Sequence, residues 1–285
     1  MNKTKIDWCD ASWNPVIGCR HNCPYCYARD IANRFGGFDG YGCEEDCKRV
    51  EETGVYDLTE PAYIKRGKEG KAVLAPFPFK FEPQILRYRL DEPKRMKKPR
   101  TIFVGSMCDL FGNWVPVQWI RDVFDACLAA PWHRYLFLTK NPRKYRELGH
   151  IALLPHDDNF WYGATATDDN GTGFFDSDHV INTFLSLEPL HGSIDLDGTE
   201  TDWVIIGAET GNRKGKVIPE RAWVDSISAQ CADMGIPVFY KDSVRKLFPD
   251  LPASRFPWSM KSRSGRDEYE RIYECCRTDG QHSQR

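Results

Sequence analysis

The sequence has no long hydrophobic run and no apolar leader. Its longest apolar stretches are short, and WVIIGA at 203–208 is an example. They are far shorter than the roughly 20 residues of a membrane-spanning helix. The opening residues MNKTKIDWCD contain no apolar core of signal-peptide length. We therefore expect a cytoplasmic protein that does not engage a membrane.

The sequence also has little net charge. At −2, the overall charge favours neither nucleic-acid nor membrane binding. The segment KRMKKPR at 94–100 is an exception, because five of its seven residues are cations. Such a run is either a solvated loop or a patch that contacts phosphates. The stretch NGTGFF at 170–175 lacks the G-x-G-x-x-G and G-K-[ST] patterns of nucleotide loops.

Apolar runs and helical patterns alternate along much of the 285-residue chain, which predicts an α/β fold with a parallel sheet. We expect a full or partial (β/α) barrel with an insertion after the first helix, and a doubly wound sheet is the competing fold. Six runs bounded by Gly, Pro or charge read as buried strands; they are 101–107, 135–140, 160–166, 183–189, 203–209 and 237–242. A seventh strand is expected at WNPVIG, residues 13–18.

Amphipathic helices are expected at 115–130 and 219–235. The first has Ile120, Val123, Phe124, Cys127 and Leu128 on one face, and the second has Trp223, Ile227, Cys231 and Met234. Cys127 and Cys231 are therefore interpreted as small core residues, and core packing is also the default interpretation of Cys108.

Two regions depart from the alternating pattern. Residues 36–100 are rich in Gly, Pro and charge and are too long for a simple connection. We interpret them as an insertion or lid within a barrel domain that covers residues 1–250. Residues 251–285 are interpreted as a C-terminal tail.

Eleven cysteines are present, an odd number that argues against a disulfide framework in a reducing compartment. Three of them, Cys19, Cys23 and Cys26, have the spacing C-x3-C-x2-C, with Tyr25 before the last. Thiolates are soft ligands that suit zinc or iron–sulfur clusters. A structural zinc site closes with four ligands, whereas this loop provides three, which suits a cubane cluster with one iron left free.

This pattern resembles the radical S-adenosylmethionine (SAM) superfamily in its spacing, its aromatic residue and its strand–loop–helix context. The helix that follows, CYARDIANRF, has Ala28, Ile31, Ala32 and Phe35 on one face. The chain further resembles the phage Gp37/Gp68-type proteins from residue 13 to about 242, in WNPVIGC, RLDEPKRMKKPRTIFVGSMCDLF, APWHRYLFLTKNP, LSLEPL, WVIIGAETG and GIPVFYKD.

The superfamily resemblance implies a radical SAM barrel, a 4Fe–4S cluster held by Cys19, Cys23 and Cys26, and SAM bound to the free iron. The reduced cluster would cleave SAM to a 5′-deoxyadenosyl radical, which would abstract hydrogen from a substrate. An electron donor such as flavodoxin or ferredoxin is the implied partner.

In a β/α barrel the chemistry lies at the carboxyl ends of the strands, which directs attention to polar residues that end the apolar runs. Expected at the cofactor are Tyr25, Ser106, Asp109, Thr139, Glu188 and Glu209, and expected in catalysis are Glu188, Glu209 and Lys241. By analogy Ser106 and Asp109 would hold the SAM amino group, although GSMCDLF stands in place of the usual Gly-Gly-Glu-like turn. Each could instead cap a helix or pair across the barrel mouth.

Other interpretations stay open. The three cysteines could bind zinc with His21 or Cys9 in a nucleic-acid-binding module, or hold a redox cluster without SAM chemistry. Cys9, Cys43, Cys47, Cys275 and Cys276 could hold a second cluster or zinc. For the substrate, the phage resemblance and the basic run favour a modified, even hypermodified, nucleobase in DNA; a small molecule or a peptide is the alternative.

Overall fold

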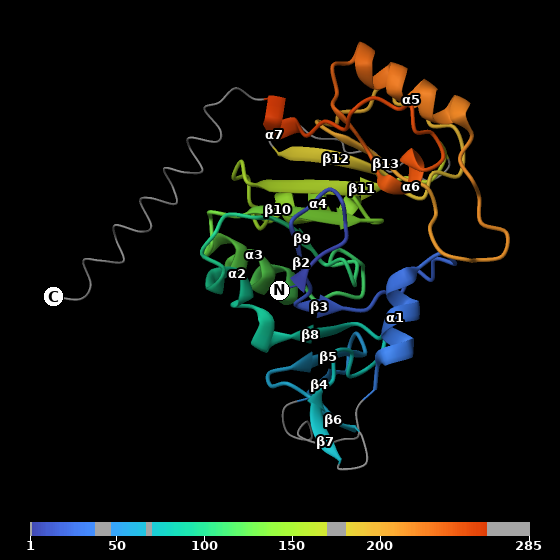
Figure 1. The fold of residues 1–285 in the computed structure, drawn as a ribbon. Helices are drawn as coiled ribbons and strands as arrows, with labels where there is room; N and C mark the ends of the chain where they lie inside the picture. Colours follow the sequence, from blue (N-terminus) through green and yellow to red (C-terminus); the bar gives the residue numbers. More distant parts are fainter. Residues whose placement is uncertain (1, 38–46, 67–69, 170–180, 261–285) are drawn as a thin grey trace.

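The structure is a computed structural model that describes residues 2–37, 47–66, 70–169 and 181–260 (Figure 1). An eight-stranded sheet has the order β1-β2-β9-β10-β11-β12-β13-β14. Its strands are β1 (Asn2–Lys3), β2 (Ala11–Trp13), β9 (Thr101–Val104), β10 (Arg134–Thr139), β11 (Phe160–Thr165), β12 (Asn182–Leu187), β13 (Val204–Ile206) and β14 (Val238–Tyr240). β1 is antiparallel to β2, and the other seven strands run parallel to one another.

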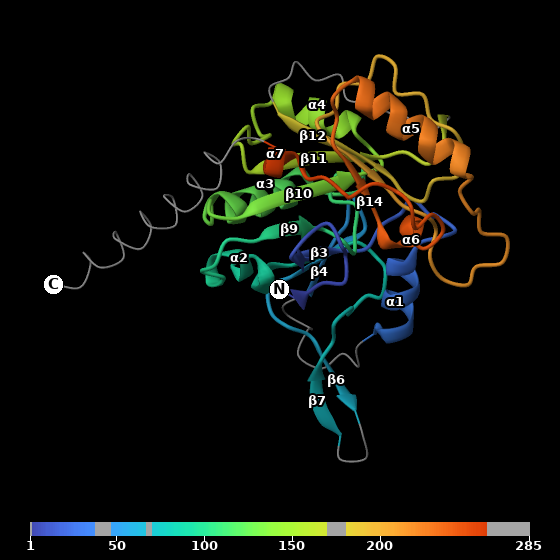
Figure 2. The ribbon, with the colours of Figure 1, turned by 45° about the horizontal axis from the view of Figure 1, so that its top comes forward.

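The seven parallel strands follow one another in chain order without a reversal. A doubly wound sheet reverses its strand order at a switch point, so the doubly wound alternative is wrong. The sheet curls into a half-barrel (Figures 1 and 2), which agrees with the expected partial β/α barrel.

All six apolar runs expected as strands contain one, but the first strand was expected in the wrong place. The barrel begins at β2 (Ala11–Trp13), and β3 (Val16–Ile17) leaves the barrel to pair with β8 (Gln84–Leu86) in a second sheet. Pro15 lies between β2 and β3 and has no N–H to continue a ladder. The chain therefore changes sheet at this residue.

Three helices cover the outer face of the half-barrel: α3 (Val117–Leu128), α4 (Arg143–His150) and α5 (Arg221–Asp233) (Figure 1). Most expected core positions of α3 and α5, including Cys127 and Cys231, are buried, and Trp223 is partly buried against the same core. Leu128 and Met234 are instead exposed, and each lies at the carboxyl end of its helix. Within the described ranges, no helix has both the length and the apolar character needed to cross a bilayer.

The inner face of the half-barrel is filled by aromatic side chains at its amino-terminal end. Phe103, Trp161, Phe184 and Trp203 from the strands pack there with Trp8. Phe256 and Trp258 join this cluster, and Trp258 lies in the short helix α7 (Pro257–Met260). The first ten residues of the expected tail are therefore part of the fold, and residues 261–285 lie outside the described residues.

The described part of the 36–100 segment forms a small module beside the barrel. Its four-stranded sheet has the order β3-β8-β5-β4, and a hairpin extends from it (Figure 1). The additional elements are β4 (Cys47–Val50), β5 (Val55–Leu58), β6 (Tyr63–Arg66), β7 (Lys71–Leu74), η1 (Arg87–Arg89) and α2 (Glu92–Arg95). Leu58, Phe81 and Leu86 of this module pack on Ala28 and Ala32 of α1 (Tyr27–Phe35).

Phe124 tests the packing between α3 and the sheet. Its ring is buried, and the centroid of this ring lies 5.4 Å from that of the Phe137 ring. Because the cavity left behind would be only partly refilled, Phe124→Ala should lower the free energy of unfolding by about 3–5 kcal/mol, measured by denaturant titration. Leu128→Ala on the exposed side of the same helix should change it by less than about 0.5 kcal/mol. Equal effects of the two substitutions would contradict the observed packing.

Candidate functional site

A cavity of about 650 Å³ opens at the carboxyl ends of the barrel strands. This volume lies within the range of small-molecule and cofactor sites. Its walls come from the cysteine loop, the N-terminal segment 4–8 and the ends of the parallel strands. All ten site residues expected from the sequence line it: Cys19, Cys23, Tyr25, Cys26, Ser106, Asp109, Thr139, Glu188, Glu209 and Lys241.

The cysteine loop begins at Gly18, where the backbone is constrained in two ways. The Gly18 N–H donates to the Met107 carbonyl at 2.9 Å, which ties the loop to the end of β9. Gly18 has φ +92°, and a Cβ there would lie 2.4 Å from the carbonyl oxygen of Glu82. Only glycine avoids both problems, so the loop can start close to the sheet.

The loop ends in the first turn of α1. Cys26 is the N-cap residue, and its Sγ accepts a hydrogen bond from the Arg29 N–H at 3.4 Å. Burial raises the pKa of the Cys19 thiol to about 12. Ligation of a metal by this thiol would therefore be accompanied by loss of its proton.

The donor chemistry of the loop fits an iron–sulfur cluster, because three thiols line one cavity and thiolates are the usual cluster ligands. In the part of the chain that the structure describes, no three His, Cys, Asp or Glu side chains stand at the separations of a metal-ligand set. Ligation by all three cysteines would therefore involve rearrangement of the loop side chains.

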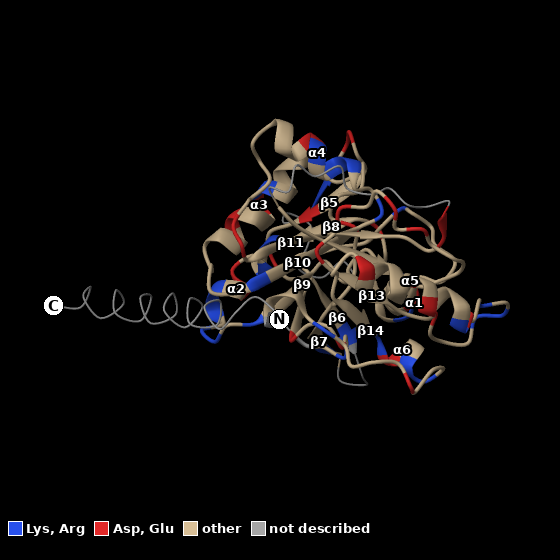
Figure 3. Cartoon of the chain, turned by 90° about the horizontal axis from the view of Figure 1, so that it is seen from above, with Lys and Arg blue, Asp and Glu red and all other residues tan. Residues whose placement is uncertain are grey.

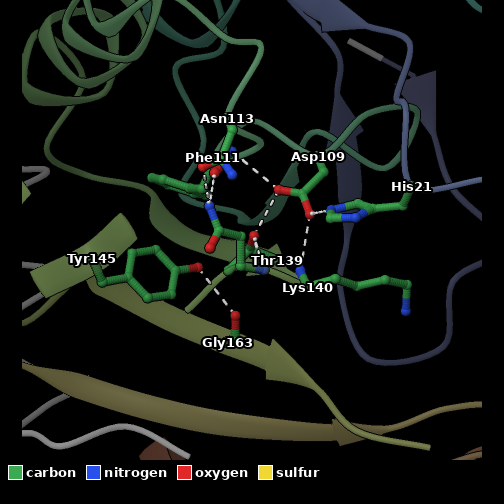
Figure 4. Close-up of polar contacts among 9 residues, drawn as sticks. His21, Asp109, Phe111, Asn113, Thr139, Lys140, Tyr145 and Gly163 are labelled. Atoms are coloured by element: carbon green, nitrogen blue, oxygen red, sulfur yellow. Dashed lines mark hydrogen bonds and ion pairs between the residues drawn. The ribbon is translucent and has the colours of Figure 1, made fainter. Parts of the chain in front are cut away.

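Asp109 connects the cysteine loop to two strands (Figure 4). This carboxylate is 5% exposed. Its Oδ1 accepts hydrogen bonds from the Phe111 N–H at 3.0 Å and the Thr139 hydroxyl at 2.7 Å. Its Oδ2 accepts from the Lys140 N–H at 2.8 Å and lies 2.7 Å from His21 Nε2.

These four contacts give both carboxylate oxygens of Asp109 two partners each. This arrangement makes Asp109 a residue that positions the loop, and its expected contact with the SAM amino group stays a prediction. Thr139 is similarly engaged, because its hydroxyl donates to Asp109 and accepts from the Asn141 N–H at 2.9 Å. Ser106, the other expected amino-group contact, exchanges hydrogen bonds with the Asn14 side chain at 3.1 Å.

Tyr25 provides a second contact between the cysteine loop and the strand ends. The Lys140 ammonium lies 5.6 Å from its ring centroid, and the His191 ring meets it edge-on at 5.4 Å. His191 Nε2 in turn lies 3.5 Å from Glu209 Oε2. The aromatic residue of the cysteine motif thus contacts residues that follow β10 and β12.

Glu209 is held as a carboxylate. The Arg213 guanidinium donates to both of its oxygens, at 2.6 and 2.7 Å. This bidentate contact holds the pKa of Glu209 below its ordinary value, against the opposing effect of desolvation. Glu209 can therefore accept hydrogen bonds at neutral pH but cannot serve there as an acid.

Glu188 and Lys241 form an ion pair across β13, with Lys241 Nζ 2.5 Å from Glu188 Oε1. Gly207 makes room for this pair: a Cβ there would lie 2.9 Å from Lys241 Cδ and 3.1 Å from Glu188 Cδ. Two of the three expected catalytic residues are therefore adjacent and neutralise each other.

The N-terminal segment crosses the open side of the half-barrel. The Asp242 N–H, at the start of α6 (Asp242–Arg245), donates to Asp7 Oδ2 at 2.7 Å. Trp8 follows and packs its ring 4.6 Å from that of Phe103. The Asp242–Asp7 hydrogen bond joins the segment before β2 to the start of α6, which follows β14. It therefore connects opposite edges of the parallel sheet.

Sequence reasoning missed three residues that support the site: His191, Arg213 and His21 in its role as a partner of Asp109. Arg213 lies four residues after Glu209 in GAETGNR, so charge spacing could have suggested that pair. No sequence pattern links His21 to Asp109 or His191 to Tyr25.

The additional cysteines receive little support as a second metal site. Cys9 is half-buried and its thiol pKa is raised to about 12, mainly by burial. Cys43, Cys275 and Cys276 lie outside the described residues, as does the side chain of Cys47. Cys108 packs against the main core and also lines the cavity.

Comparison with known proteins identifies a family but no activity. The family model described as "Protein of unknown function (DUF5131)" matches residues 3–248. No curated protein and no solved structure matches the chain.

His21 can be varied to test whether Asp109 anchors the cysteine loop. His21→Phe keeps a ring against Trp114, which lies 5.0 Å from the histidine ring, but removes the donor to Asp109. We expect a stability loss of about 1.5–3 kcal/mol and several-fold faster alkylation of Cys19 and Cys23 by iodoacetamide in the native protein. His21→Gln supplies an N–H and should restore slow alkylation.

Thr139→Val is the matched control, because it removes a hydrogen bond to the same carboxylate without touching the loop. It should lower stability while leaving alkylation of the loop cysteines slow. Unchanged alkylation in His21→Phe would contradict the anchoring role.

Proposed function

The chain belongs to the DUF5131 family, and we propose that it is a radical SAM enzyme whose 4Fe–4S cluster is held by Cys19, Cys23 and Cys26. The single observation that carries this proposal is the convergence of the C-x3-C-x2-C loop and the charged strand ends on one cavity. The half-barrel supports it, because parallel β/α scaffolds use their carboxyl-terminal face for chemistry.

When bound, the cluster and SAM would supply an electron and a 5′-deoxyadenosyl radical able to abstract hydrogen from a substrate. The protein's own task is to position the reactants and exclude water. Tyr25, with Lys140 and His191 against it, holds the loop end that carries Cys26. Asp109 holds the other part of the loop through His21.

The acidic residues of the cavity would bind polar groups. Glu209, kept ionised by Arg213, can accept hydrogen bonds from hydroxyl or ammonium groups of SAM or of the substrate. Lys241, which is paired with Glu188, can in addition contact a carboxylate or phosphate of a ligand.

Two features argue against the zinc-module alternative. His21 Nε2 is committed to Asp109, and the Cys9 thiol donates to the Ile6 carbonyl at 3.9 Å. A zinc module also needs no seven-stranded scaffold.

For the substrate we propose a modified nucleobase in nucleic acid, with a small molecule or a peptide as the alternative. The side chains of Lys94, Arg95, Lys97, Lys98 and Arg100 are all exposed, beside α2 (Figure 3). Arg95 pairs with Asp91 at 2.5 Å, and Lys97 lies 5.9 Å from the Trp132 ring centroid. This segment leads into the amino end of β9, so it would contact phosphates away from the cavity mouth.

Cluster ligation is tested by Cys23→Ala. The anaerobically purified wild-type chain should contain about four iron and four sulfide ions per chain and should cleave SAM after reduction. Cys23→Ala should lose most of its iron and this cleavage, because a cluster ligand is removed. Cys231→Ala removes a buried core thiol and should keep both. A colourless wild-type protein with stoichiometric zinc, or full cleavage by Cys23→Ala, would refute the proposal.

Nucleic-acid binding is tested by its salt dependence. Phosphate contacts release counterions, so affinity for duplex DNA should fall steeply with salt. Neutralising Lys94, Lys97 and Lys98 together should flatten the slope of log K against log salt by up to about 0.9 per lost contact. Fluorescence anisotropy at several salt concentrations measures this slope. If the wild type has no DNA affinity at low salt, the segment is a solvated loop and the small-molecule alternative gains support.

A further inference from the structure

Lys140 is a half-buried cation in the wall of the cavity. It follows β10 directly, and the three cysteines of the loop line the same cavity. Among the residues that the structure describes, its Nζ forms no ion pair with a carboxylate, whereas Lys241 is paired with Glu188. A cation in a partly enclosed wall is best stabilised by an anion opposite it. This site therefore favours an anionic group next to Lys140.

Lys140 lies against the cysteine loop on both sides of Cys23. Its backbone N–H and His21 Nε2 approach the same oxygen, Asp109 Oδ2, at 2.8 and 2.7 Å. Its ammonium lies 5.6 Å from the Tyr25 ring centroid. Because Cys23 lies between His21 and Tyr25 in the sequence, the lysine is beside the loop at this thiol.

The other charges near the loop do not neutralise the Lys140 ammonium by contact. Asp109 has both oxygens filled by other donors, and Figure 4 shows the Lys140 side chain extending away from this carboxylate. His21 faces Asp109 at 2.7 Å, so a charge on its ring would be offset there. Glu209, a further carboxylate of the cavity, is paired with Arg213. Lys140 is thus a positive charge beside the thiols of the loop.

A charge in this position affects how easily a cluster accepts an electron. Reduction adds a negative charge to a 4Fe–4S cluster whose thiolate ligands already make it anionic, and the surrounding charges help to set its potential. A nearby cation favours the reduced form, because its attraction grows with the added charge. At an effective dielectric constant of about 20, a unit charge roughly 10 Å away changes such an equilibrium by about tenfold.

We propose that the Lys140 ammonium stabilises the reduced state of the cluster and thereby raises its reduction potential. This inference rests on the proposed function, in which the cluster accepts one electron from a low-potential donor before SAM is cleaved. It gives Lys140 a role that its contact with Tyr25 does not supply. A lysine that only held Tyr25 would affect the stability of the loop and its iron content, but not the potential.

Lys140→Met removes the charge and keeps most of the aliphatic stem. In the anaerobically prepared chain with its cluster and without SAM, the equilibrium constant for one-electron reduction should fall about tenfold. This fall corresponds to about 59 mV toward lower potential, measured by a redox titration that follows the electron paramagnetic resonance signal of the reduced cluster. Lys140→Arg keeps the charge and should restore the wild-type potential. Iron and sulfide content should be unchanged in both variants.

Lys144→Met is the matched control. Lys144 lies four residues further along the chain, in α4, does not line the cavity, and is paired with Glu147 at 2.8 Å. Because that charge is already compensated and lies outside the cavity wall, its removal should leave the reduction potential at the wild-type value.

The outcomes separate the electrostatic role from the chemistry. Equal potentials for the wild type and Lys140→Met would refute the role of Lys140 while leaving the radical SAM assignment intact. An equally lowered potential in Lys140→Arg or Lys144→Met would also refute it, since the effect would not follow the charge at this site. Loss of iron in Lys140→Met, with an unchanged potential of the remaining cluster, would make Lys140 a structural contact of Tyr25. A wild-type chain without a reducible cluster would refute the proposed function, and this inference with it.

Discussion

The buried carboxylate of Asp109 is the constraint on which the site depends. A charge with so little solvent contact is stable only if its hydrogen-bonding capacity is filled. Its donors come from the cysteine loop, from the turn after β9 and from the end of β10 (Figure 4). Satisfying one carboxylate therefore places the cysteine loop against the carboxyl edge of the sheet.

Two further carboxylates of the cavity, Glu188 and Glu209, are compensated by cationic side chains. Glu209 is paired with Arg213, and Glu188 with Lys241. Such pairs limit the electrostatic cost of placing charges in an enclosed site. The cavity is thus polar at its rim and aromatic below, where Trp8 and Phe103 separate it from the core of the half-barrel.

The small module of residues 47–100 has a consequence for helix α1. By packing on Ala28 and Ala32, it holds the helix that starts at Cys26 and leaves the opposite face in solvent. One helix therefore links the thiols of the cavity to the exposed apolar side chains of Tyr27, Ile31 and Phe35. The described residues of this module do not form a lid over the cavity mouth, because among them only Phe81 lines the cavity.

The sequence by itself determined the features that depend on local pattern. Buried apolar runs identified six strands of the half-barrel, the spacing of Cys19, Cys23 and Cys26 needs only eight consecutive residues, and parallel strands bring their ends to one edge wherever they pair. Tertiary structure alone decided the rest. Pro15 ended the first strand early. His21 meets Asp109, and His191 meets Tyr25, across about 90 and 170 residues of sequence, respectively. Local periodicity reports which residues are buried, whereas the partners of a buried charge depend on how distant segments pack.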